Sequence, residues 1–352
     1  MNVQPEAIRE KALELGYEKC AVLPLANLDG FGSEVDRRLD KIPDDNRKAI
    51  DKAVLDRFKA FDRLAELYPW ARAAVICVMG YGVYRIPDNL KNRVARYFCV
   101  DSRKDERSGE FKASQAFEDY LTSLGLKIQT ERQYGLLPLR WAAYKAGLGV
   151  GRRNNFFYTG RGSWIHLESW LIDRDLELTE TSDLKPCPEE CQKCQKACPT
   201  GALAEPYLTR PGSCLTLINA LRPVNWIDHP YSQAAGDWIY GCELCQTCCP
   251  YNQGKWQEEK DFPGLEELSR HLDLGQIIGA DYSFIRENLV PKFWYLTADR
   301  DWQWKVNALN AMKNRWKPEY GPYLERALND ERPEVRQMAE WAGRLLKRRS
   351  GL

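Results

Sequence analysis

The chain has 352 residues, 44% of them hydrophobic and 29% charged, with a formal net charge of +1 at pH 7. This length supports more than one hydrophobic core, and the balanced charge neither recruits nor excludes nucleic acid. No apolar run reaches the roughly 20 residues of a membrane span, and the first residues do not resemble a signal peptide, so we expect a cytoplasmic protein with no membrane partner.

The first half of the chain alternates helical and strand-like patterns. Apolar spacing and stop signals predict helices at 5–15, 113–124 and 136–146. Apolar runs of strand length lie at 17–23, 73–79 and 126–129. This alternation indicates an α/β or α+β core over residues 1–180, and we favour the α+β class.

Two cysteine-rich runs follow the core, within a predicted ferredoxin-like domain over 181–258. They read Cys187-Pro-Glu-Glu-Cys191-Gln-Lys-Cys194-Gln-Lys-Ala-Cys198-Pro199 and Cys242-Glu-Leu-Cys245-Gln-Thr-Cys248-Cys249-Pro250. Thiolates at such short spacings converge on one iron-sulfur cube, and in the bacterial two-cluster pattern the cysteine before proline ligates the other cluster. The sequence therefore predicts two 4Fe-4S clusters with exchanged ligands.

The exchange rule divides eight of the twelve cysteines into two quartets. The first quartet is Cys187, Cys191, Cys194 and Cys249. The second quartet is Cys198, Cys242 and Cys245, completed by Cys214 from between the runs. Zinc sites or disulfides are the alternative, but neither needs the cysteine-proline endings or a linking cysteine. Cys187 is the least secure ligand because its gap is one residue longer than usual. Cys248 competes with Cys249, which the following proline favours.

Beyond the second run the pattern becomes helical. Three- and four-residue apolar spacing predicts helices at 304–312, 322–328 and 333–346. Paired short helices of this kind are typical of one HEAT-type repeat, and a plain helical hairpin is the alternative. We therefore expect a helical, HEAT-like domain over 259–352.

The cluster runs and several core motifs resemble the epoxyqueuosine reductase family over nearly the whole chain. The motifs are Lys145-Ala-Gly-Leu-Gly149, Gly162-Ser-Trp164, Ala197-Cys-Pro-Thr-Gly-Ala-Leu203 and the context of the second run from Ile239 to Asn252. The resemblance implies a cobalamin-dependent reductase, related to corrinoid reductive dehalogenases. A nitroreductase-like core would bind base-off cobalamin, and two clusters would feed it electrons from a low-potential flavodoxin or ferredoxin. We expect a monomer.

The resemblance also implies which core residues contact the corrinoid. They are Arg96, Tyr97, Gly147, Gly149, Gly151, Arg152, Asn154, Ser163 and Trp164. Glycines would let the backbone approach a flat macrocycle, although glycine is equally expected in a helix cap or a turn.

One departure from the family falls on its proton donor. The family's aspartate before the Ala-Gly-Leu-Gly helix aligns with Gln133, so no carboxylate fills this position. Tyr134 lies next to it and is our candidate acid, with Arg140 or Arg152 as the cation that stabilises the phenolate. Glu131 is the second candidate if the register slips by two residues.

The sequence alone is compatible with three functions. The departure at Gln133, together with the altered family motifs at residues 98–103 and 150–152, favours a corrinoid-dependent iron-sulfur reductase of a small or nucleoside-type substrate. The alternative within the class is a true epoxyqueuosine reductase acting on tRNA in queuosine biosynthesis. The third is a non-catalytic, ferredoxin-like electron-transfer protein whose core has lost its cofactor.

Overall fold

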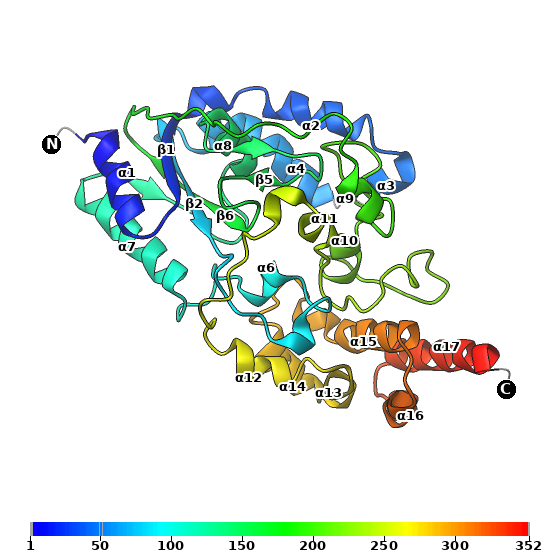
Figure 1. Cartoon of the computed structure of the whole chain (residues 1–352). Helices are drawn as coiled ribbons and strands as arrows, with labels where there is room; N and C mark the ends of the chain where they lie inside the picture. Colours follow the sequence, from blue (N-terminus) through cyan, green and yellow to red (C-terminus); the bar gives the residue numbers. More distant parts are fainter. Residues whose placement is uncertain (1–2, 49, 51, 351–352) are drawn as a thin grey trace.

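A four-stranded antiparallel sheet forms the centre of the N-terminal half in the computed structural model, which describes residues 3–350 except 49 and 51 (Figure 1). The strand order is β1-β2-β6-β3. These strands are β1 (Lys19–Pro24), β2 (Ala73–Gly80), β6 (Ile165–Ile172) and β3 (Ile128–Gln129). A separate hairpin pairs β4 (Val150–Gly151) with β5 (Phe157–Tyr158).

Helices cover both faces of the sheet (Figure 1). On one face, α1 (Pro5–Glu14) and α7 (Gly109–Ser123) share a core with Cys20 and Val22 of β1. On the other face, α8 (Leu139–Lys145) shares a core with Ala21 and Leu23. Because successive strand residues point to opposite faces, a strand covered on both faces is apolar throughout. The continuous apolar run of β2 has the same cause.

The remaining helices fall into three groups along the chain. Between β1 and β3 in the chain lie α2 (Phe31–Leu39), α3 (Asp44–Lys48), α4 (Lys52–Ala60), α5 (Leu64–Leu67) and α6 (Arg96–Cys99). The cysteine-rich segment carries only α9 (Lys193–Ala197), α10 (Leu215–Asn219) and α11 (Leu244–Thr247). The C-terminal part holds α12 (Leu265–Arg270), α13 (Leu274–Gly279), α14 (Tyr282–Phe284), α15 (Gln303–Asn314), α16 (Gly321–Ala327) and α17 (Pro333–Ser350).

The mixed helix and sheet fold expected from the sequence is confirmed, and the predicted elements differ mainly at their ends. Helix α7 begins at Gly109 rather than at 113 because the Ser108 hydroxyl accepts a hydrogen bond from the Phe111 amide and caps the helix. The strand predicted at 126–129 is shorter, since only Ile128 and Gln129 pair with β6. Within the described residues, no helix is both long and apolar enough to cross a membrane.

The cysteine-rich segment and the C-terminal helices share one hydrophobic core, which also includes residues from the first half of the chain. The rings of Tyr240 and Trp304 stack with their centroids 5.1 Å apart. Asn307 of α15 lies in this core, accepts a hydrogen bond from Trp226 Nε1 at 2.8 Å, and donates to the carbonyls of Asn219 and Ile239. The C-terminal helices therefore support the segment that carries the cysteines.

Replacing Asn307 with alanine should be strongly destabilising. The change removes three buried hydrogen bonds. It leaves the Trp226 indole N–H and the Ile239 carbonyl without partners, at about 1–3 kcal/mol for each group, while the Asn219 carbonyl keeps Gln303 as a donor. We expect N307A to lower the unfolding free energy by about 3 kcal/mol or more, measured by anaerobic thermal unfolding. Asn314→Ala, at the partly exposed end of the same helix, is the control and should cost less. Equal losses in the two variants would contradict this account.

Candidate iron-sulfur and catalytic site

The first predicted quartet surrounds one small cavity. Cys187, Cys191 and Cys194 line it from the first run, and Cys249 lines it from the second. Burial and then the Cys249 and Cys187 thiols raise the pKa of Cys194, which places these sulfurs within electrostatic reach of one another. The structure thus brings together the three cysteines and the exchanged fourth that the spacing predicts.

The second predicted quartet gathers separately. Burial and then the Cys214 and Cys198 thiols raise the pKa of Cys242 to about 12. Burial is also the main cause of the raised pKa of Cys245, and the Cys214, Cys242 and Cys198 thiols add to it. Cys214 stands at the N-terminus of α10, close to the second run although it is distant in sequence.

Cys248 and Cys249 have different surroundings. Cys249 is buried and lines the cavity, and its thiol lies within electrostatic reach of the Tyr158 hydroxyl. Cys248 lies near the same quartet, but its thiol is directed at the Cys245 carbonyl oxygen, 3.7 Å away. The geometry therefore favours Cys249 as the fourth ligand.

All twelve cysteines are free thiols. No three His, Cys, Asp or Glu side chains in the described part of the chain converge as ligands of a single metal ion. Burial raises the pKa of the Cys194, Cys242 and Cys245 thiols, so bound iron would be needed to hold these sulfurs as thiolates.

The core docks against the cluster segment through several residues predicted to contact a corrinoid. Arg96 Nε donates to Glu243 Oε1 at 2.6 Å, and burial raises the Glu243 pKa against the opposing effect of Arg96. Asn154 donates to the Cys245 carbonyl at 2.9 Å, and the Ser163 amide donates to Asn252 Oδ1 at 2.8 Å. These contacts fix the cluster segment to the sheet.

Aromatic rings gather beside Arg96. Its guanidinium lies 4.3 Å from the ring centroid of Trp164 and 4.5 Å from that of Trp256, while Tyr97 packs edge-on against Tyr81. Trp164 is almost fully buried, yet its Nε1–H has no hydrogen-bond partner among the residues that the structure describes. A ligand with an amide carbonyl at this point would supply the missing acceptor.

The three predicted glycines approach the chain itself. A side chain at Gly147 would overlap the Glu180 carbonyl, and one at Gly149 would overlap the Tyr158 carbonyl. Gly151 lies against the Tyr144 ring. Packing within the protein thus explains why these positions are glycine, and their contact with a corrinoid stays a prediction.

The two predicted acids lie in one loop. Glu131 accepts hydrogen bonds from the Gln133 and Tyr134 amides, each at 2.7 Å, and so holds the turn. Tyr134 is 55% exposed and its ring packs edge-on against Trp294.

The expected cation for Tyr134 was wrong. Arg57 lies over the Tyr134 ring, 5.2 Å from its centroid. Arg140 instead bonds to the Asn155 carbonyl, and Arg152 faces Cys187. Arg57 is therefore the cation that the structure places at the Tyr134 ring.

Asp101 and Arg103 form a buried pair that sequence analysis missed. Arg103 donates to both Asp101 oxygens, at 2.9 and 2.7 Å, to the Gln133 carbonyl at 2.6 Å, and to the Tyr295 hydroxyl at 3.2 Å. Burial opposes ionisation of Asp101, but Arg103 outweighs it and lowers the pKa of the carboxyl. The pair ties the loop of Gln133 to the C-terminal segment, and no spacing in the sequence indicates this.

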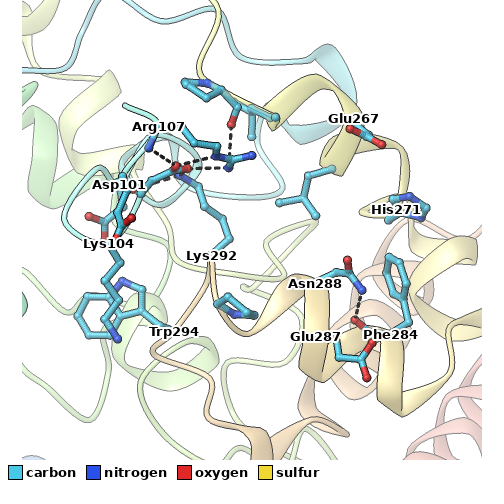
Figure 2. Close-up of a pocket in the computed structure, with 17 residues that line it drawn as sticks. Asp101, Lys104, Arg107, Glu267, His271, Phe284, Glu287, Asn288, Lys292 and Trp294 are labelled. Atoms are coloured by element: carbon cyan, nitrogen blue, oxygen red, sulfur yellow. Dashed lines mark hydrogen bonds and ion pairs between the residues drawn. The ribbon is translucent and has the colours of Figure 1, made fainter. Parts of the chain in front are cut away.

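A cavity of about 530 Å³ adjoins this region between the 101–107 loop and the C-terminal helices (Figure 2). Asp101, Lys104 and Trp294 line it on the side of the loop, and His271 and Phe284 line it on the helical side. Both acidic and basic side chains line the cavity, so charge alone does not indicate which class of ligand it would bind.

Lys292, also at this cavity, should make stability depend on pH. Burial lowers its pKa to about 8, although Asp101 and Asp105 oppose the shift. Below that pH the Lys292 ammonium is charged and buried in the folded protein, which lowers the unfolding free energy. Above it the folded state loses the proton before the unfolded state does, so the unfolding free energy should rise by up to about 3 kcal/mol toward pH 10.

Anaerobic thermal unfolding of wild type and K292M between pH about 7 and about 10 measures this effect. The wild type should gain stability relative to K292M as the pH rises through this range. Parallel pH profiles for the two proteins would show that Lys292 does not titrate in this way.

Comparisons with known proteins agree with this geometry. Residues 187–252 match the family model of the 4Fe-4S double cluster binding domain. An epoxyqueuosine reductase of Bacillus subtilis is 24% identical over 97% of this chain and 88% of its own length. One of Prochlorococcus marinus is 32% identical over 49% of this chain, but the match spans only about half of that enzyme (54%). The solved structure of an epoxyqueuosine reductase with an epoxyqueuosine-modified tRNA stem loop superposes with a TM-score of 0.74 at 21% identity, over 96% of this chain and 88% of that chain.

The matched domain indicates an iron-sulfur protein, and the fold is shared with solved epoxyqueuosine reductases. The chain is homologous to the epoxyqueuosine reductases, which confirms the family resemblance of its sequence. The preferred prediction of a reductase for a small or nucleoside-type substrate was wrong, because the relatives support the alternative, an epoxyqueuosine reductase. That prediction gave too much weight to the missing carboxylate at Gln133. A change at one loop position does not alter the rest of the fold.

Proposed function

We propose that this protein is an epoxyqueuosine reductase that acts on tRNA. The observation that carries the proposal is the gathering of eight thiols into two quartets, in a chain homologous to epoxyqueuosine reductases. Reducing an epoxide to an alkene takes two electrons and two protons and releases the oxygen as water. Two one-electron clusters fit that demand. Flavodoxin or ferredoxin would be the donor.

Within this proposal, residues 1–180 form the corrinoid-binding core, 181–258 the ferredoxin-like domain and 259–352 the helical domain. Cobalamin would supply the low-potential reduction when bound. Arg96, Tyr97 and Trp164 would hold it beside the cluster segment, and the unpartnered Trp164 Nε1–H suits one of its peripheral amides. Anaerobic protein that takes up no cobalamin would count against this part.

The proton source is proposed to lie in the loop of Glu131 and Tyr134. Arg57 lies above the Tyr134 ring, where its charge interacts favourably with the aromatic face. Glu131 holds the loop through two amide hydrogen bonds, and Arg103 anchors the Gln133 carbonyl. These residues would place the acid; the clusters would deliver the electrons.

Expression in a bacterial strain that lacks its own epoxyqueuosine reductase tests the function. We expect queuosine to appear in tRNA at the expense of epoxyqueuosine, read by mass spectrometry of digested tRNA. Cys194→Ser, which removes one thiol of the first quartet, should abolish the conversion. Persistent epoxyqueuosine alongside a wild-type protein that carries both clusters would overturn the proposal and leave electron transfer as the remaining function.

A further inference from the structure

Arg152 presents a buried charge to the first quartet. The residue is 2% exposed, and its Nη1 lies 3.8 Å from Cys187 Sγ. Its guanidinium packs 3.3 Å from the ring centroid of Tyr251 and 5.1 Å from that of Tyr158. The two rings hold the guanidinium against the cavity that the quartet lines.

No carboxylate pairs with this cation among the residues that the structure describes, and its buried Nε has no hydrogen-bond partner. A buried charge without compensation is costly, so the compensating negative charge must come from the cavity. A cube held by four thiolates is negatively charged, and its sulfurs accept hydrogen bonds. Arg152 is therefore placed to contact the outer surface of the cluster, and its Nε–H is available to donate a hydrogen bond to it.

Tyr158 adds a second contact of the same kind. Its hydroxyl lies within electrostatic reach of the Cys249 thiol and accepts a hydrogen bond from Asn154 Nδ2 at 2.8 Å. Arg152 and Tyr158 both belong to the segment of β4 and β5, so the core reaches the first quartet at two of its sulfurs.

The second quartet has different neighbours. Cys198 Sγ lies 3.6 Å from the Thr200 hydroxyl, and Cys214 is hydrogen-bonded to Thr216. Both of these contacts come from neutral hydroxyl-bearing residues. The charge around the two quartets is therefore unequal.

We propose that Arg152 is a positioning residue of the first cluster and raises its reduction potential above that of the second. Reduction adds negative charge to a cube, so a fixed guanidinium stabilises the reduced form more than the oxidised form. The first cluster is then reduced first and holds its electron more firmly. This inference rests on the two-cluster assignment within the proposed function.

An anaerobic redox titration followed by EPR tests the inference on the full-length protein. The wild type should show two one-electron steps. In R152Q the step at higher potential should move down, leaving about tenfold less reduced cluster at a fixed potential, or about 59 mV for one electron. The other step should stay in place. R152K retains the charge but not the planar fork, so its shift should have the same sign and be smaller.

Arg132→Gln is the matched control, because Arg132 is partly buried and ion-paired to Glu118 within the core. Its titration should equal that of the wild type. Unchanged potentials in R152Q with both clusters present would overturn the role of Arg152. If R152Q loses half of its iron, the reduction potential of the first cluster in R152K is the deciding measurement. A potential below that of the wild type supports the role of Arg152, and an unchanged potential refutes it. A wild type with fewer than two clusters would overturn the two-cluster proposal as well.

Discussion

Cys249→Ser should remove one cluster and leave the other, so that iron falls from about eight to about four atoms per chain. Cys249 lines the cavity of the first quartet although it belongs to the second run. Serine is a poor ligand for iron in a cube, and three thiolates hold it less firmly. Iron and sulfide analysis of anaerobically reconstituted protein measures the loss, and EPR should retain the signal of the remaining cluster.

Cys248→Ser is the matched control, one residue away in the same run. Its thiol is directed at the Cys245 carbonyl, a contact that a serine hydroxyl can replace. We expect iron to remain near eight atoms per chain. The opposite outcome, with C248S losing the cluster and C249S keeping it, would reassign the fourth ligand and refute the proline rule for this chain.

Arg103→Ala should cause the largest loss of stability among the core variants, together with a loss of activity. The Asp101 carboxylate would be left buried without its partner, which costs about 3–5 kcal/mol. The Gln133 carbonyl and the Tyr295 hydroxyl would lose their donor at the same time. A displaced loop should reduce turnover by about a hundredfold, because misplacement by about 1 Å has that effect.

The chain offers a close control in Asp105 and Arg107, which repeat the same two-residue spacing. Arg107 donates to both Asp105 oxygens at 2.9 Å, but its side chain is 65% exposed. Asp105 is itself only 9% exposed, but Lys292 Nζ lies 3.9 Å from its carboxylate and remains as a cation in R107A. Because the Arg107 charge is screened by solvent, R107A should change the unfolding temperature and turnover less than R103A. If R103A behaved like R107A, the buried pair would not anchor the loop.

The sequence predicted the parts of the site that depend on local spacing. The eight thiols of the two quartets and the apolar strand β2 follow from patterns of a few residues, and the structure brings the thiols together in the predicted groups. Contacts between distant segments could not be predicted in this way. Arg96 and Glu243 are 147 positions apart, and Arg103 and Tyr295 are 192 apart. Only the packing of the cysteine-rich segment and of the C-terminal segment against the core brings such pairs together.

The order of the quartet cysteines along the chain constrains biosynthesis. The second quartet is complete only when Cys245 has left the ribosome, and the first only after Cys249. A nascent chain that ends between the two runs exposes Cys187, Cys191, Cys194 and Cys198 with no complete set of ligands. Iron-sulfur carriers can therefore load either cube only at a late stage of translation, and the two insertions should occur almost together.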